Sequence, residues 1–161
     1  MDNILYQDRF TFHMKQKTLL IVKPDGVKKG LVGECIKRFE NNGFEILALK
    51  LTKLSKPFVA DFYKHLKPKL NPKLFKAIIE FMSSGIVAII IAERDNAVLK
   101  AREICGATNP KEAKKGTIRA DYSKEDLRIN AKKNKATPNI IHASGSAEEA
   151  ADEIRKIKKL L

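Results

Sequence analysis

The longest uninterrupted apolar run in the sequence extends from Ile86 to Ala92, and it most constrains the fold. A helix of this length is far too short to cross the hydrocarbon core of a membrane, which is about 30 Å thick. A short run rich in β-branched residues is instead typical of a central strand covered on both faces. Because 161 residues suit one compact domain, we expect a single domain over residues 14–161, with no membrane-spanning part.

Strand and helix patterns alternate on both sides of this run. Strands are predicted at residues 18–22, 44–53, 86–93 and 139–142. Helices are predicted at residues 32–42, 55–66, 71–84, 95–105 and 146–157, and the polar stretch after Gly106 is left without elements. This order predicts an α+β fold, a ferredoxin-like βαββαβ antiparallel sheet with added helices, and these helices are expected to pack on one face.

The N-terminus and the two cysteines bear on the cellular compartment. Residues 1–13 lack the apolar segment of a secretory signal and are followed at once by Met14, so we interpret them as a leader or N-terminal extension and exclude His13 from the site. Cys35 and Cys105 form no CxxC motif and no cluster with histidine, which argues against a tetrahedral metal site. Both are predicted to be buried free thiols, which favours a reducing cytoplasm.

The balance of charges narrows the choice of partners. The chain carries 32 Lys and Arg against 19 Asp and Glu, a formal net charge of +13. Such a charge predicts attraction to polyanions, namely nucleic acid, nucleotides or anionic membrane surfaces. The lysines are spread along the chain, so a solvated lysine-rich surface is an equally good interpretation. Two function classes therefore stay open, an enzyme acting on nucleotides and a basic module that binds nucleic acid non-specifically.

His142 has the most specific surroundings of any candidate catalytic residue. It is followed by a short Ala-Ser-Gly-Ser turn and by a capped helix, whose N-terminal dipole favours a nearby anion such as phosphate. A neutral imidazole is a competent nucleophile towards phosphorus if a partner accepts its other N–H, and Glu153 is one candidate partner. The alternative is an ordinary surface or core histidine, which from spacing alone is the commoner case.

Three cationic and two aromatic side chains are further candidates for an anion or nucleotide site. Lys23 ends a strand in a Pro-Asp-Gly loop, where its ammonium can meet phosphates. Arg102 and Arg119 offer planar guanidinium groups that suit phosphoryl oxygens. Tyr63 and Phe75 can stack on a base if they lie at the edge of a cleft. Each also has an ordinary interpretation, a solvated cation or a core aromatic residue.

Two common phosphate-binding motifs are absent from the sequence. It contains neither a GxxxxGK[ST] loop nor a GxGxxG turn, which excludes those modes of phosphate binding. The strands at residues 18–22 and 86–93 are aliphatic, so they lack the aromatic signature of an RNA-recognition sheet. This weakens the nucleic-acid alternative.

Five motifs in a fixed order resemble those of the nucleoside diphosphate kinases, and archaeal members in particular, over about Thr18 to Ile157. They are Lys23-Pro24-Asp25-Gly26-Val27, Glu80-Phe81-Met82-Ser83-Ser84-Gly85, Gly106-Ala107-Thr108-Asn109-Pro110, Gly116-Thr117-Ile118-Arg119 and Asn139-Ile140-Ile141-His142-Ala143-Ser144. The resemblance implies a ping-pong reaction, in which His142 takes the γ-phosphate of a nucleoside triphosphate as phosphohistidine and passes it to a nucleoside diphosphate. The substrates would be ATP, GTP, ADP, GDP and other nucleotides, with Mg²⁺ carried on their phosphates rather than held by metal ligands of the protein.

The resemblance also implies roles for further residues. Phosphates and sugar would be held by Lys23, Tyr63, Arg102, Thr108, Arg119 and Asn139. Phe75 would stack on the base, and Ser144 and Glu153 would support the imidazole. The family commonly assembles as a homo-oligomer, a hexamer, and its C-terminal extension touches neighbouring subunits, whereas this sequence ends at Leu161.

Several positions depart from the common family pattern. Leu74 stands where a second Phe is frequent, and the segment between Tyr63 and Phe75 is longer than usual. Gly145 stands where an Asp usually follows the serine. The lysine-rich stretch at residues 122–138 is an insertion close in sequence to the predicted catalytic histidine, and the sequence assigns it no role.

Overall fold

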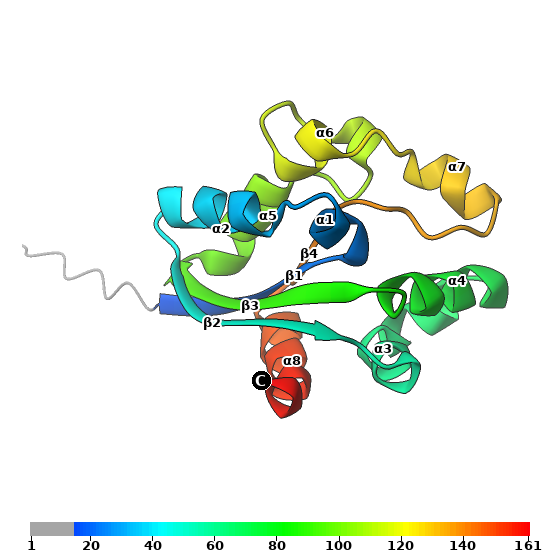
Figure 1. Ribbon diagram of the computed structural model, residues 1–161, viewed down its shortest axis with the longest axis horizontal. Helices are drawn as coiled ribbons and strands as arrows, with labels where there is room; N and C mark the ends of the chain where they lie inside the picture. The colour runs from blue at the N-terminus through cyan, green and yellow to red at the C-terminus, as the bar shows by residue number, and fades with distance from the viewer. Residues whose placement is uncertain (1–14) are drawn as a thin grey trace, which may run out of the picture.

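The computed structural model describes residues 15–161, which form a four-stranded antiparallel sheet with helices on both faces (Figure 1). The strand order is β2-β3-β1-β4. The central strands are β1 (Lys15–Val22) and β3 (Ile86–Asp95), and the edges are β2 (Glu45–Lys53) and β4 (Ile141–Ala143). All three pairings are antiparallel, which confirms the α+β class and the predicted sheet. The interpretation of residues 1–13 as a leader lies outside the described residues.

One face of the sheet is covered by α2 (Val32–Asn41) and α5 (Ala97–Cys105). Leu20 and Val22 of β1 point to this side and join a core cluster with Phe39 of α2. Cys35 and Cys105 are buried in the same cluster as free thiols, as predicted. The apolar side of α2 therefore packs against the sheet.

The second face is covered by α8 (Ala147–Ile157), α3 (Lys56–Phe62) and α4 (Pro72–Met82), which corrects the expectation of helices on one face. The reason lies in the central strands. Leu19 and Ile21 alternate with Leu20 and Val22, and all four side chains are fully buried, so both faces of β1 must be covered. A separate core cluster on this side includes Leu19 and Ile21.

Capping side chains begin three of the helices where the sequence predicts them. Ser55 accepts a hydrogen bond from the Phe58 amide at 3.3 Å, and Asn71 accepts one from the Leu74 amide at 2.9 Å. Ser146 likewise begins α8. Each cap satisfies one amide that has no partner within its helix.

Other boundaries differ from the prediction. The helix expected to reach Leu66 ends at Phe62 and is followed by the 3₁₀ helix η1 (Lys64–Lys69). Asp95, where the next helix was expected to begin, belongs to β3, and α5 begins at Ala97. In the first turn of α5 the Val98 amide donates to the side chain of Gln16 in β1 at 2.9 Å. Short helices occupy segments predicted as loops or left without elements. They are α1 (Pro24–Lys28), η2 (Pro110–Glu112), α6 (Ile118–Tyr122), α7 (Leu127–Lys132) and η3 (Lys158–Leu160).

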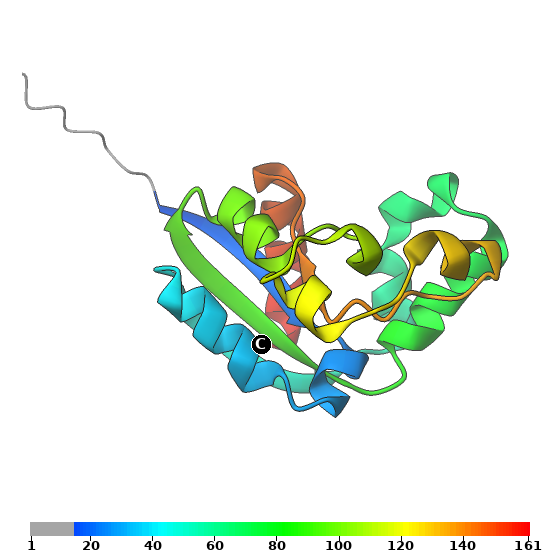
Figure 2. The same cartoon turned by 90° about the horizontal axis from the view of Figure 1, so that it is seen from above.

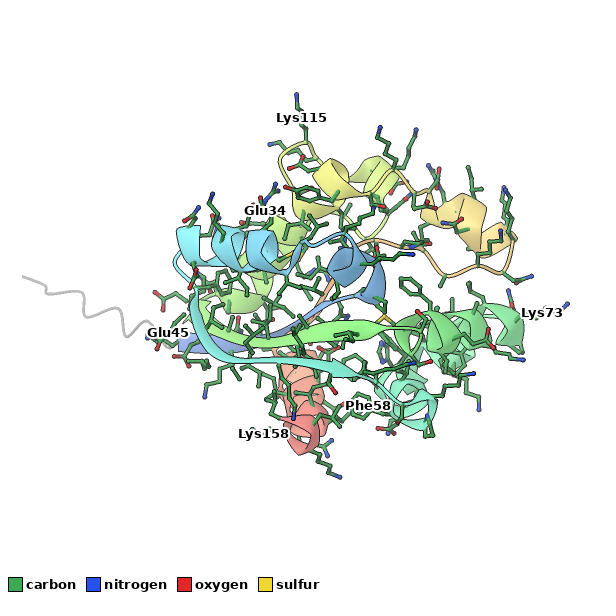
Figure 3. The ribbon with its side chains drawn as sticks, viewed as in Figure 1. Glu34, Glu45, Phe58, Lys73, Lys115 and Lys158 are labelled. Atoms are coloured by element: carbon green, nitrogen blue, oxygen red, sulfur yellow. The ribbon has the colours of Figure 1, made fainter. Side chains whose placement is uncertain are left out.

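The surface and the helix lengths bear on two sequence predictions. No helix within residues 15–161 is long and apolar enough to span a bilayer. Lysine side chains project on different sides of the molecule, as Lys73, Lys115 and Lys158 illustrate (Figure 3). This distribution fits a solvated lysine-rich surface better than one basic nucleic-acid groove.

Gly26 gives a test of the packing between α1, the end of β1 and Ile140, the residue that precedes β4. A Cβ at this position would lie 2.8 Å from both the Ile140 carbonyl oxygen and Cγ1 of Val22. We therefore expect Gly26→Ala to lower the free energy of unfolding by about 1–3 kcal/mol, measured by urea denaturation. Gly33→Ala in α2 is the control, because no atom lies within 4 Å of its added Cβ. Equal stability of the two variants would contradict this packing.

Candidate active site

His142 lies in the middle of β4, directly opposite Ile21 of the central strand β1. Its imidazole packs edge-on against two aromatic rings of the α3 region, with ring centroids 5.5 Å from Phe62 and 6.0 Å from Tyr63. Such edge-to-face contacts are a favoured arrangement of aromatic rings. The imidazole is partly exposed and lines a cavity.

A strained turn delivers the chain into β4. Ile140 has φ of +71°, and the Ile141 amide donates to the Asn139 carbonyl at 2.8 Å, which forms a γ-turn. A β-branched residue in this conformation costs about 1–3 kcal/mol. The Lys23 amide donates to the Ile140 carbonyl at 2.8 Å, and Asp25 accepts the Ile140 amide at 3.0 Å. The segment from Lys23 to Asp25 therefore holds the turn that precedes His142.

Glu153 and Ser144 form a buried support behind the imidazole. Nε2 of His142 lies 2.8 Å from Oε1 of Glu153, although the two atoms are not aligned as a hydrogen bond and have no other partner within residues 15–161. Ser144 donates to the other Glu153 oxygen at 2.7 Å, and its Oγ accepts the Leu19 amide at 3.2 Å. Nε2 is thus enclosed, so Nδ1 is the ring nitrogen that can meet a ligand in the cavity.

The charge state of Glu153 follows from these contacts. Burial opposes its ionisation, but the contact with His142 and the hydrogen bond from Ser144 outweigh burial and lower the pKa of the carboxyl group. The carboxylate is therefore ionised at neutral pH and can balance a positive imidazole.

Lys23 is joined to two other predicted residues in a chain of hydrogen bonds. Its Nζ donates to Oδ1 of Asn139 at 2.7 Å, and Nδ2 of Asn139 donates to the Thr108 carbonyl at 2.8 Å. Burial and the neighbouring Arg119 guanidinium lower the pKa of Lys23 to about 8. The ammonium is therefore mostly protonated at neutral pH, although burial and the nearby Arg119 make its positive charge unfavourable.

Arg119 is a buried cation anchored by backbone carbonyls. It donates from Nη1 to Gly106 at 2.8 Å and from Nη2 to Ile141 at 2.7 Å, while its Nε has no partner among the described residues. Burial lowers the pKa of Arg119, but an arginine side chain keeps its charge in proteins. Arg102 is exposed at the same cavity.

A cavity of about 410 Å³ brings the separate candidates together. Its lining includes seven residues predicted from the sequence, namely Lys23, Tyr63, Arg102, Thr108, Arg119, Asn139 and His142. Ser144 and Glu153 lie behind the imidazole rather than on the lining. Burial raises the pKa of Tyr63, and the nearby Glu153 carboxylate adds to this effect, so the phenol stays neutral.

Phe75, the residue predicted to stack on the base, does not line the cavity. It is partly buried against the core cluster on the second face, and the cavity wall is formed by its neighbour Leu74. Adjacent residues of a helix point about 100° apart, so the one-residue difference decides which side chain faces the cavity. The frequent Phe at position 74 in the resembling family was the available signal.

Two further parts of the lining were missed. One is Glu149, in the first turn of α8 beside Gly145. The other is the stretch at residues 122–138, which contributes Leu127, Ala131, Lys135, Ala136 and Thr137 opposite α4 (Figure 1, Figure 2). Buried Asn109 holds this wall, because it accepts the Leu127 amide at 2.9 Å. Hydrophobic periodicity could not predict that this stretch forms a wall of the cavity, because its helix α7 has no buried residue.

The cavity therefore combines an imidazole with fixed positive charge. An imidazole with a carboxylate behind it faces a space lined by the ammonium groups of Lys23 and Lys135 and by two guanidinium groups. Such a set suits transfer of a phosphoryl group, whose transition state needs cations and positioned donors more than a strong base. Within residues 15–161, His142, Glu149 and Glu153 are the cluster whose ligand atoms, all within 4.8 Å of one another, could hold a metal ion.

Comparison with known proteins agrees with this chemistry. A family model described as "Nucleoside diphosphate kinase" matches residues 16–159. A nucleoside diphosphate kinase of Campylobacter jejuni is 48% identical over 139 residues, which cover 86% of this chain and 92% of that protein. One of Francisella philomiragia is 45% identical over 141 residues, covering 88% and 91%. A solved nucleoside-diphosphate kinase structure from Borrelia burgdorferi, titled as a transition state mimic with bound vanadate and ADP, gives a TM-score of 0.84 at 34% identity and covers 88% of this chain and 86% of that one.

Proposed function

We propose, from the premise that this chain belongs to the nucleoside diphosphate kinase family, that it moves the γ-phosphate between nucleotides through a phosphohistidine at His142. The observation that carries the proposal is the pairing of Nε2 with Glu153 at 2.8 Å. This contact leaves Nδ1 as the nitrogen with access to the cavity and its cations.

The reaction has two steps, phosphorylation of His142 by one nucleotide and transfer of the phosphoryl group to a second. The lone pair of Nδ1 forms a bond to the γ-phosphorus of a nucleoside triphosphate, and the bond from that phosphorus to the bridging oxygen breaks, leaving a nucleoside diphosphate. The imidazole then carries positive charge, which the ionised Glu153 balances. A terminal phosphate oxygen of a second nucleoside diphosphate then forms a bond to this phosphorus, and the bond between phosphorus and Nδ1 breaks. The products are a nucleoside triphosphate and neutral His142.

The phosphate-binding roles rest on the charges of the lining. Lys23, Arg102 and Arg119 supply the positive charge that the transferring group needs, and Thr108, Asn139 and Tyr63 supply neutral polar groups. Lys23 and Arg119 are held by bonds to Asn139 and to backbone carbonyls, so little reorganisation is needed during transfer.

The base would lie between two mainly aliphatic walls. One wall comes from η1 and α4, with Leu66, Leu70, Leu74, Ile78 and Phe81, and the other from Leu127, Ala131 and Ala136. In place of Phe75 we assign the base contact to Leu74. Contact with apolar walls and few base-edge hydrogen bonds supports acceptance of both purine and pyrimidine nucleotides.

Magnesium fits this cavity as an ion carried by the nucleotide. Within residues 15–161 the lining offers one carboxylate, Glu149, which is too few for an octahedral site made by protein alone. Mg²⁺ commonly takes most of its ligands from phosphates and water, with one or two carboxylates from the protein. When bound, the ion neutralises charge on the phosphate oxygens.

Phosphate labelling tests the assignment of His142 as the nucleophile. Incubation with γ-labelled ATP should give an acid-labile, base-stable phosphoprotein, and His142→Ala should carry no label. His65→Ala is the matched control, because His65 also lines the cavity and should keep the label. Equal labelling of His142→Ala and the unsubstituted protein would contradict the assignment.

A second prediction follows from the lowered pKa of Lys23, about 8. The ammonium binds phosphate only while it is protonated, so its contribution is present below this pKa and is lost as the pH rises through it. We expect ADP affinity to fall about tenfold between pH 7 and pH 9, measured by calorimetry. Lys23→Gln should bind ADP weakly at both pH values. A wild-type affinity that stays constant, or a slope that persists in Lys23→Gln, would contradict this role.

Exposed leucines on edge strand β2 bear on the assembly of the protein. Edge strand β2 exposes Leu47, Leu49 and Leu51 at 41%, 50% and 58%, and an exposed apolar edge strand is suited to pairing with a second copy of the chain. We propose a homo-oligomer built on this edge. The buried free thiols support a cytoplasmic location.

Light scattering tests the assembly. The wild type should have a multiple of the mass of one chain, and Leu51→Lys should shift it towards a single chain. Leu99→Lys is the control, because Leu99 is as exposed, at 59%, but lies on α5. A monomeric wild type, or equal dissociation of both variants, would contradict the proposal.

A further inference from the structure

Glu149 is the one acidic side chain on the cavity lining within the described part of the chain. It extends from the first turn of α8 and is partly buried. The other charged or titratable lining residues are basic, namely Lys23, His65, Arg102, Arg119 and Lys135, apart from His142 and Tyr63. A lone carboxylate among groups that attract phosphate opposes the binding of a bare nucleotide, so it calls for a cation.

The carboxylate occupies space next to the imidazole that residue 145 leaves open. A Cβ at Gly145 would lie 2.4 Å from Oε2 of Glu149, so this side chain fills the position where a larger residue 145 would begin. Ligand atoms of Glu149, Glu153 and His142 all lie within 4.8 Å of one another. Glu149 is therefore at the catalytic end of the cavity.

Glu149 is the more accessible member of a carboxylate pair, because it is partly buried whereas Glu153 is almost fully buried, and its side chain lies in hydrogen-bonding contact with Glu153. Glu153 is 3% exposed, accepts a hydrogen bond from Ser144 and contacts His142. Its carboxylate is therefore held against the imidazole. Its Oε1 has no aligned hydrogen-bond donor although it is buried. Two neighbouring carboxylates repel each other unless a proton or cation lies close to them. The carboxylate that can turn towards a bound cation is that of Glu149.

We propose that Glu149 determines the preference of this site for metal-bound over metal-free nucleotide. Its carboxylate attracts the divalent cation on the nucleotide phosphates and repels phosphates that lack one. This inference rests on the proposed function, because it needs a nucleotide in the cavity, but it assigns a selective role to a residue outside the motifs of the resembling family.

The test compares equilibrium binding of ADP in excess Mg²⁺ with binding of ADP in EDTA at matched ionic strength. The wild type should bind the Mg²⁺ form more tightly, and Glu149→Gln should reduce the ratio of the two dissociation constants by about tenfold. Much of this change should come from tighter binding of metal-free ADP, because the repulsion is removed.

Two variants make the test specific. Glu148→Gln removes an exposed carboxylate from the same turn, away from the cavity, and should keep the wild-type ratio. The double variant Gly145→Asp with Glu149→Ala moves the carboxylate to the adjacent backbone position and should retain the preference. An unchanged ratio in Glu149→Gln, an equal loss in Glu148→Gln, or equal weakening of both ADP forms would overturn the inference. A wild type that binds neither form would instead contradict the proposed function.

Discussion

The central interaction is a short series of contacts that ties the imidazole of His142 to the sheet. Nε2 lies against Glu153 of α8, Glu153 accepts from Ser144, and Ser144 accepts the amide of Leu19 on the central strand β1. All three groups behind the imidazole are buried. The position of the nucleophile therefore depends on the packing of α8 against β1, and the carboxylate that enables a positive imidazole is fixed by the core of the fold.

A second constraint acts from the opposite side of the site. The γ-turn at Ile140 is unfavourable by itself, and it is held by bonds to the first loop, which also carries Lys23. Asn139 lies in the same turn and bonds to the Lys23 ammonium at 2.7 Å. The principal cation and the nucleophile are thus parts of one connected unit, so a change in the first loop is expected to disturb both.

The sequence predicts most of this architecture, and the failures have physical causes. Alternating patterns and capping residues locate the strands and long helices. The family resemblance locates seven lining residues, five of them within its motifs. The choice between Leu74 and Phe75 depends on the rotation of one helix, which apolar periodicity does not resolve because both neighbours are apolar. Glu149 is the last residue of the capping-box pattern Ser146-Ala147-Glu148-Glu149, so the sequence explains it as a helix-capping residue. Its proximity to Gly145 depends on the three-dimensional path of the turn. The stretch at residues 122–138 is mostly polar, and the few apolar residues that form its wall show no sustained helical periodicity; the wall is held by Asn109 from an earlier segment.

The stretch at residues 122–138 forms one side of the cavity. Residues 127–137 and α4 form facing walls, so the cavity has an apolar end for a base and a charged end around His142. The central claim is that phosphate is carried on Nδ1 while Nε2 stays against Glu153. The most direct measurement is NMR of the phosphorylated protein labelled with ¹⁵N in histidine, in which phosphorus–nitrogen coupling identifies the bonded atom. Coupling to Nδ1 of His142 is predicted, and coupling to Nε2 or to another residue would contradict the account.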